Sequence, residues 1–274
     1  MALDRAYSIR DDLILDLNGY TISASLQEPL FVVGANKTLT LTGNGTIQNT
    51  KWIARASDDG DIIINSGTYI TAKEGFTLDG DGSTLVMNGG TIRTQETGIV
   101  PHRGSVVEMN GGLIETVDNF GIASNGNKGQ GNNLIVITGG KIDAHIETNG
   151  YEACAVYVAN NDTLIMSGGE LIANNGCGIC MRAGDVTIES GVIVATGEAG
   201  TTGKVGDGSF QMGKSAVIFH ETSNYPGQQD GEMKLTINGG TFVGVDHSVE
   251  VLSNAVEPKV YVNGGDFTPP YPEN

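Results

Sequence analysis

The chain has few cysteines, few basic residues and a single tryptophan. Its 274 residues include 3 Cys, 1 Trp and 15 Lys plus Arg, against 32 Asp plus Glu. An odd number of cysteines without the spacing of a disulfide framework does not suggest a small secreted domain held together by disulfides. The net charge of −17 disfavours nucleic-acid phosphate and anionic lipid as partners. We therefore predict neither a nucleic-acid partner nor a membrane partner.

Long apolar runs are also missing. No stretch approaches the ~20 apolar residues of a membrane-spanning helix, and the first ten residues are polar and charged, unlike a signal peptide. We expect the chain to fold in a cytoplasm. It then stays there, leaves by a route without a signal peptide, such as a virion released by lysis, or is a piece of a longer exported protein.

Glycine, in contrast, is abundant, and it marks an internal repeat. The 41 glycines are roughly double the usual share, and many follow the pattern apolar-x-apolar-Asn-Gly-Gly-x-apolar. The clearest copies are Leu85 to Ile92, Val107 to Ile114, Ile135 to Ile142, Leu164 to Leu171, Leu235 to Phe242 and Val260 to Phe267. Looser copies are Leu15 to Ile22, Leu39 to Ile47, Ile62 to Tyr69 and Val186 to Ile193. Copies recur every 22 to 29 residues, except for one interval of 49, between Gly191 and Gly240, which we take as two repeats.

This repeat predicts an all-β solenoid. Two apolar side chains at i and i+2 share one face of a strand, and the glycines permit a sharp turn. A second apolar strand follows in most copies, which leaves no room for the helices of a βαβ fold. We predict one domain over residues 13–268, a single-stranded right-handed parallel β-helix of about eleven coils. Residues 1–12 form an N-terminal lid or partner-contacting segment, and residues 269–274 form a C-terminal tail.

The stretch from Leu13 to Ile22, Leu-Ile-Leu-Asp-Leu-Asn-Gly-Tyr-Thr-Ile, resembles the opening coil of pectate-lyase-like right-handed β-helix proteins. The resemblance covers about residues 13–268, and copies such as Thr236 to Phe242 resemble phage and bacterial surface proteins. It is specific for architecture and weak for activity, because this fold carries lyases, hydrolases, adhesins and phage spikes.

Asparagine precedes the glycines in six copies. These residues are Asn18, Asn65, Asn88, Asn110, Asn238 and Asn263. Identical side chains one coil apart lie ~4.8 Å from each other, within reach of amide hydrogen bonds. We therefore predict a structural asparagine ladder.

Acidic turns are the candidate metal ligands. They supply Asp58, Asp59, Asp61, Asp79 and Asp81. Asp79 and Asp81 follow the other three by about one coil, so a shared Ca²⁺ site is a candidate, although Ca²⁺ requires 6–8 oxygens and these residues also favour turns. We otherwise expect no cofactor.

Carbohydrate or partner contacts are expected from the lone tryptophan and from loops that interrupt the period. The candidates are Trp52, Lys128, Tyr225, Gln228 and Gln229. Polar loops with an aromatic residue can contact sugars or proteins, but they are also what tolerated insertions look like, and Trp52 can equally serve in packing.

Recognisable catalytic constellations are missing. The Gly-His-Gly and Arg-Ile-Lys runs typical of polygalacturonase-like enzymes do not occur, and His102-Arg103 stands alone after Pro101. Cys177 and Cys180 have Cys-x-x-Cys spacing without a second ligand pair, so buried thiols are the simpler interpretation.

We therefore expect a non-enzymatic structural protein of a bacteriophage virion: a head fibre, capsid decoration protein or spike whose rigid rod binds host-surface glycan. A polysaccharide lyase or glycoside hydrolase acting on acidic polysaccharide is one alternative. A bacterial cell-surface adhesin fragment, extracellular and part of a longer protein, is the other. Exposed strand edges at the ends of a solenoid favour association, so the expected partners are copies of the chain, with a trimer favoured, or other virion proteins.

Overall fold

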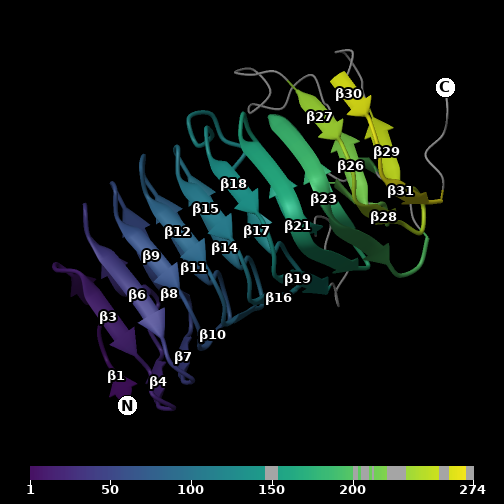
Figure 1. Ribbon diagram of the computed structural model, residues 1–274. Coiled ribbons are helices and arrows are strands. Elements are labelled where there is room, and N and C mark those ends of the chain that lie inside the picture. The colour runs from purple at the N-terminus through teal and green to yellow at the C-terminus, as the bar shows by residue number, and fades with distance from the viewer. Residues whose placement is uncertain are drawn as a thin grey trace.

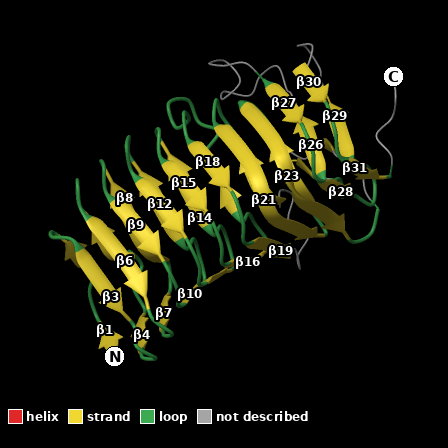
Figure 2. Ribbon diagram, viewed as in Figure 1, coloured by secondary structure: helices red, strands yellow, loops and turns green. Residues whose placement is uncertain are grey.

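The protein is an all-β, solenoid-like stack of parallel strands (Figure 1). The computed structural model describes residues 1–145, 154–199, 213–220, 233–252 and 259–269, and the backbone alone at 203–204 and 210–211. No helix occurs in these ranges, as Figure 2 shows, and thus none that could cross a membrane. Each repeat contributes strands to three columns, in which every strand pairs with the equivalent strands of the repeats before and after it.

Column 1 contains the strand that precedes the Gly-Gly corner. Its members are β3 (Leu13–Asp16), β6 (Thr38–Thr42), β9 (Asp61–Ile64), β12 (Thr84–Met87), β15 (Val106–Met109), β18 (Leu134–Ile137), the first halves of β21 (Thr163–Asn174) and β23 (Asp185–Thr196), β27 (Lys234–Ile237) and β30 (Lys259–Val262).

Column 2 contains the strand that follows the corner. Its members are β1 (Ala2–Leu3), β4 (Thr21–Ala24), β7 (Thr46–Asn49), β10 (Thr68–Thr71), β13 (Thr91–Thr94), β16 (Leu113–Val117), β19 (Lys141–His145), the second halves of β21 and β23, β28 (Thr241–Val243) and β31 (Asp266–Thr268). Columns 1 and 2 join in one 19-stranded sheet because β21 and β23 run from one column into the other.

Column 3 is a separate 10-stranded sheet. Its members are β2 (Tyr7–Ile9), β5 (Pro29–Val33), β8 (Trp52–Ser57), β11 (Phe76–Asp79), β14 (Ile99–His102), β17 (Ile122–Ala123), β20 (Cys154–Val158), β22 (Cys177–Met181), β26 (Val217–His220) and β29 (Val249–Leu252). A short antiparallel pair, β24 (Gly203–Lys204) and β25 (Phe210–Gln211), lies between β23 and β26 in the sequence.

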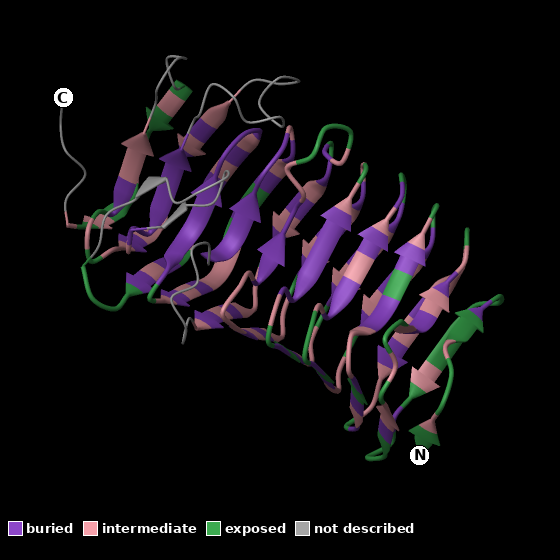
Figure 3. Cartoon of the chain, turned by 180° about the vertical axis from the view of Figure 1, so that it is seen from behind, coloured by how far each residue is buried: buried purple, intermediate pink, exposed green. Residues whose placement is uncertain are grey.

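Stacked apolar rows fill the interior. Alternate residues of each strand point inward, so one row of column 1 runs through Leu39, Ile62, Leu85, Val107, Ile135, Leu164, Val186 and Leu235, all fully buried. Fully burying such a side chain contributes about 1.5–3 kcal/mol relative to exposure. In Figure 3, seen from behind, exposed residues are concentrated in the turns and in the strands at both ends of the stack. The core therefore runs along the whole stack.

The interval of 49 residues was predicted to contain two repeats, and this is wrong. Asp185 of β23 pairs directly with Lys234 of β27, and Val192 pairs with Thr241 of β28. β26 pairs with β22 on one side and β29 on the other, so it is the third strand of a single repeat. The additional residues lie in the connections before and after β26, where they change the sequence spacing without adding a level to the stack.

The N-terminal segment 1–12, expected to act as a lid, contributes β1 and β2. These strands pair with β4 and β5 in the same register as later strands. The N-terminal segment therefore continues columns 2 and 3. Of the expected C-terminal tail, only Pro269 lies among the described residues.

The asparagines at the corner are hydrogen-bonded in two runs. In the first, the Asn88 amide donates to Asn65 at 3.0 Å and the Asn110 amide donates to Asn88 at 3.1 Å. In the second, Asn263 donates to Asn238 at 2.8 Å. Asn18 differs: its φ is +43° and its backbone N–H donates to Asp16.

Candidate ligand-binding groove

A groove of about 300 Å³ lies on the outer face of column 3, near the middle of the N-terminal half. It is lined by Pro29, Trp52, Arg55, Glu74, Thr77, Asp79, His102, Arg103 and Gln130. Its floor is the sheet itself, since Arg55 pairs in register with Thr77 and Asp79 pairs with His102. The turns on either side of the sheet form the walls.

Trp52 forms one wall and is held in place. Its indole N–H donates to the Glu74 carboxylate at 2.6 Å, and the Thr77 hydroxyl donates to the same carboxylate oxygen at 3.3 Å. The Lys51 ammonium lies 4.3 Å from the indole centroid and covers one face of the ring by a cation–π contact. The tryptophan is thus oriented from its edge and from one face, and a ligand would have to use the other.

Two arginines converge on one carboxylate in the same groove. Asp79 accepts a hydrogen bond from Arg55 and forms a second ion pair with Arg103 at 2.5 Å. The Asp79 side chain is 14% exposed, whereas the two arginine side chains are 46% and 53% exposed. Each guanidinium carries five N–H donors, so both arginines keep donors that face the solvent. This part of the groove can bind a carboxylate or a group of hydroxyls.

His102 lies beside Asp79 and has an unusual environment. Its Nδ1 is shielded from solvent and makes no hydrogen bond to any residue that the structure describes. Burial lowers the pKa of His102, opposed by the charges of Asp79 and Glu74 and reinforced by those of Arg103 and Arg55. Burial therefore favours the neutral imidazole at pH 7, and its Nδ1 is shielded from solvent beneath the groove surface.

The groove joins residues that the sequence assigned to different roles. Trp52 was predicted as a sugar contact and Asp79 as a metal ligand, yet both line this groove. Lys128 is exposed in the loop that also supplies Gln130. Tyr225, Gln228 and Gln229 lie outside the described residues.

Arg55, Glu74 and His102 were missed as members of one site. The repeat period, applied to the strands of column 3, could have brought these residues together. Glu74 follows Trp52 by one repeat, and His102 follows Asp79 by one repeat. His102-Arg103 does not stand alone, since its partners come from the preceding repeats.

The five aspartates proposed as metal ligands are not all gathered in one place. Asp79 binds the arginines, and Asp61 hydrogen-bonds Thr84. Asp58 and Asp59 have positive φ in the turn after β8, and the Asp59 N–H donates to the Asp81 carbonyl. Within the described ranges, no three His, Cys, Asp or Glu side chains are placed to hold a metal ion. A Ca²⁺ site stays a prediction.

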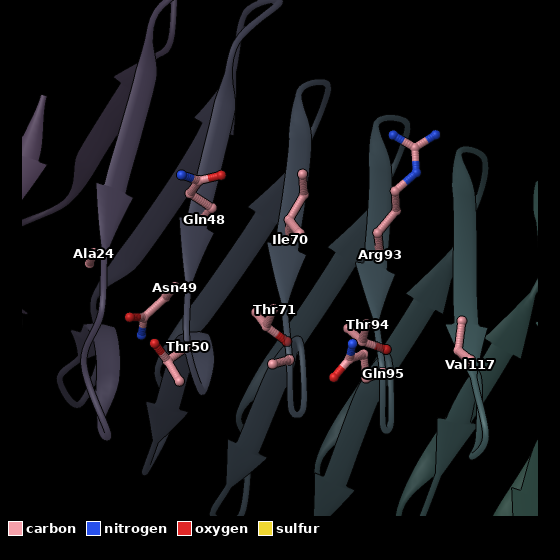
Figure 4. A pocket seen from close by; sticks show the side chains of 11 residues that line it. Ala24, Gln48, Asn49, Thr50, Ile70, Thr71, Arg93, Thr94, Gln95 and Val117 are labelled. Carbon is pink, nitrogen blue, oxygen red and sulfur yellow. The ribbon is translucent and has the colours of Figure 1, made fainter. Parts of the chain in front are cut away.

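A second, more open groove of about 430 Å³ lies on column 2 (Figure 4). Gln48, Ile70 and Arg93 project outward in one row from β7, β10 and β13, and Thr71 and Thr94 lie nearer the next turn. Arg93 is paired with Glu115 of the next strand. This groove lacks the aromatic residue and the paired arginines of the first groove.

The cysteines are buried among apolar side chains. Cys154 pairs in register with Cys177, and both pack in a cluster with Cys180, Tyr157 and Ile218. Burial raises the pKa of Cys177 well above that of a free thiol. The Cys177 thiol is therefore protonated at neutral pH and poorly reactive.

The fold and the groove together define a parallel-strand, solenoid-like protein with one partly enclosed aromatic and ionic site. Comparison with known proteins finds no matching family model, no matching curated protein and no matching solved structure.

Proposed function

We propose that this chain is a right-handed parallel β-helix that acts as a rigid rod and binds a sugar of a surface glycan in the Trp52 groove. The right-handed sense is that of nearly all connections between parallel strands. Ten strands of column 1 spaced ~4.8 Å apart make a stack roughly 45 Å long, and β1 extends column 2 by one further level. Such a rod presents the groove at a fixed position.

One observation carries the binding proposal: an indole held by Glu74 and two arginines that share Asp79 line one groove of single-sugar size. Small-ligand sites combine apolar contact area with a few fixed polar groups. The part of Trp52 that lines the groove offers the apolar area, while Arg55, Arg103 and Gln130 offer planar donors and acceptors. A pyranose ring has an apolar face and a rim of hydroxyls, and an acidic sugar adds a carboxylate that suits arginine.

Binding is tested by titrating the full chain with polygalacturonate and, for comparison, with neutral dextran. Trp52→Ala should weaken binding about 5- to 30-fold, as expected for losing 1–2 kcal/mol of contact, whereas Tyr20→Ala, which removes an exposed aromatic residue outside the groove, should not. Arg55→Gln should weaken binding of the acidic polymer. Its control is Arg93→Gln, which removes an equally exposed, ion-paired arginine from another face. Equal effects of groove and control variants would exclude this groove as the site.

The biological setting that we propose is a bacteriophage particle, in which the chain is a non-enzymatic head fibre, decoration protein or spike. This rests on the sequence resemblance and on the regularity of the repeats. Quantitative mass spectrometry of purified particles should find the chain in a fixed ratio to the major capsid protein. Its absence from particles of the phage that encodes it would overturn this setting.

Enzymatic cleavage of an acidic polysaccharide is the second candidate, favoured by His102. A neutral imidazole beside two arginines has the elements that proton abstraction next to a bound carboxylate requires. Incubation with polygalacturonate followed by size-exclusion chromatography distinguishes the two. An unchanged polymer supports binding alone, and shortening that His102→Gln abolishes supports the enzyme.

A further inference from the structure

Two buried asparagines hold the turns on either side of the Trp52 groove, although neither lines it. Asn49, labelled in Figure 4, is the last residue of β7 in column 2, and the turn that follows it leads to Trp52. Asn133 immediately precedes β18 of column 1 and follows the loop that supplies Gln130. A buried side-chain amide is costly unless it is hydrogen-bonded, so the partners of these two amides show which backbone groups they fix.

Asn49 fixes the turn that carries Trp52. Its side-chain amide donates to the Trp52 carbonyl at 2.8 Å and to the Glu28 carbonyl at 3.0 Å. Its Oδ1 accepts a hydrogen bond from the Leu26 N–H at 2.8 Å. Glu28 directly precedes Pro29, which also lines the groove. One side chain therefore ties the backbone of Trp52 to the turn of the preceding repeat.

Asn133 fixes the loop at the other edge of column 3. Its side-chain amide donates to the Gln130 carbonyl at 3.0 Å and to the Asp162 carboxylate at 2.8 Å. The Gln130 carbonyl also accepts a hydrogen bond from the Arg103 N–H at 2.9 Å. Gln130 and Arg103 both line the groove, and Arg103 has a φ of +56°. Asn133 thus reaches the backbone of Arg103 through a single carbonyl oxygen.

Hydroxyl groups make the equivalent bonds in neighbouring repeats. Thr71 pairs in register with Asn49, and its hydroxyl donates to the backbone carbonyl three residues later at 3.1 Å. Ser105 precedes β15 as Asn133 precedes β18, and its hydroxyl donates to the backbone carbonyl three residues earlier at 2.5 Å. A hydroxyl at position 49 or 133 can therefore keep the bond to the groove residue, whereas alanine cannot.

We propose that Asn49 and Asn133 are positioning residues of the groove, and that they orient Trp52 and Arg103 respectively. This inference rests on the proposed binding of a sugar in that groove. Each asparagine acts through the backbone of a groove residue, so its removal leaves every group that contacts the sugar present but less firmly held. Ordering those groups then becomes part of the cost of binding.

Titration of the full chain with polygalacturonate tests the two roles, with fluorescence of Trp52, the only tryptophan, as the signal. Asn49→Ala and Asn133→Ala should each weaken binding about 3- to 10-fold, the equivalent of one net hydrogen bond. Asn49→Thr and Asn133→Ser should bind nearly as tightly as the wild type. Asn110→Ala removes a ladder asparagine at the corner between columns 1 and 2, so it should lower stability without weakening binding. Equal weakening by the alanine and hydroxyl variants would refute the proposal.

Two measurements on the ligand-free chain separate this inference from the proposed function. Acrylamide quenching of Trp52 should increase in Asn49→Ala but not in Asn133→Ala, because only Asn49 bonds the Trp52 backbone. Hydrogen exchange of the Arg103 amide should become about 3- to 10-fold faster in Asn133→Ala and stay near the wild-type rate in Asn133→Ser. A wild type that binds no sugar would overturn the proposed function. Unchanged quenching and exchange in the alanine variants would overturn the positioning roles, whether or not the sugar binds.

Discussion

Replacing Gly112 with alanine should destabilise the protein through contact with the preceding repeat. Gly112 is the second corner glycine between β15 and β16, and its φ is +86°. A Cβ built there lies 2.8 Å from the Gly90 carbonyl oxygen and 2.9 Å from the Gly89 carbonyl carbon. Both are backbone atoms of the preceding level in the stack, so they cannot rotate away.

The expected cost has two parts. Holding alanine at positive φ costs about 1–2 kcal/mol, of which a more restricted unfolded state offsets about 0.4–1 kcal/mol. Forcing an additional methyl group against fixed backbone adds about 1–3 kcal/mol. Gly112→Ala should therefore lower the free energy of unfolding by roughly 2–4 kcal/mol.

Gly19 provides the matched control. Its φ of +79° is nearly that of Gly112, but a Cβ there meets nothing within 4 Å. Gly19→Ala should cost only the conformational part, about 1 kcal/mol. Urea unfolding followed by far-ultraviolet circular dichroism measures both variants. Equal midpoints for Gly112→Ala and Gly19→Ala would show that the clash between levels contributes nothing.

Three further predictions follow from side chains. Asn88→Ala breaks two ladder hydrogen bonds and should lower the free energy of unfolding in urea by about 1–2 kcal/mol. Asn263→Ala breaks one such bond and should lower it by about half as much. Equal losses for the two variants would contradict the ladder. Burial raises the pKa of Asp162, so ionisation of this carboxyl destabilises the fold once the pH rises above the pKa of the unfolded state, near 3.9. Asp162→Asn should therefore raise the melting temperature at pH 7. This increase in melting temperature should shrink below pH 4. Cys177 should resist a thiol reagent until the protein unfolds in urea, since it is fully buried with a raised pKa; rapid labelling of the folded chain would contradict this.

The repeat motif predicts most of the fold because the same residues set both the period and the packing. Leu85 and Val107 occupy equivalent positions in the motif, and they pair in register in the structure. The prediction failed at the one place where length alone was used. Between Gly191 and Gly240 the interval matched two repeats, but a long connection and an additional repeat have the same length and differ only in which strands pair.

The groove was harder to predict than the fold, because only its floor follows the repeat. Its floor follows from the period, since Asp79 and His102 are one repeat apart. Its walls depend on turns, whose conformations vary between repeats. Arg103 reaches Asp79 from a position with φ of +56°, and Gln130 comes from a loop longer than its counterparts. No periodic pattern predicts where such side chains point.

Column 3 also explains why the groove lies where it does. Toward the C-terminal end, β20, β22 and β26 are buried on both faces, and Phe120 stacks on Tyr157 with centroids 4.9 Å apart. Toward the N-terminal end, Arg55 and Thr77 of the same column are open to solvent or half-open. A flat array of strands cannot enclose a ligand by itself. A pocket therefore forms in column 3 between the strands whose outer face is buried and the strands whose outer face is open to solvent. Arg55, Asp79 and His102 lie in the strands next to that boundary, and a ligand bound there would rest on the stack of column 3.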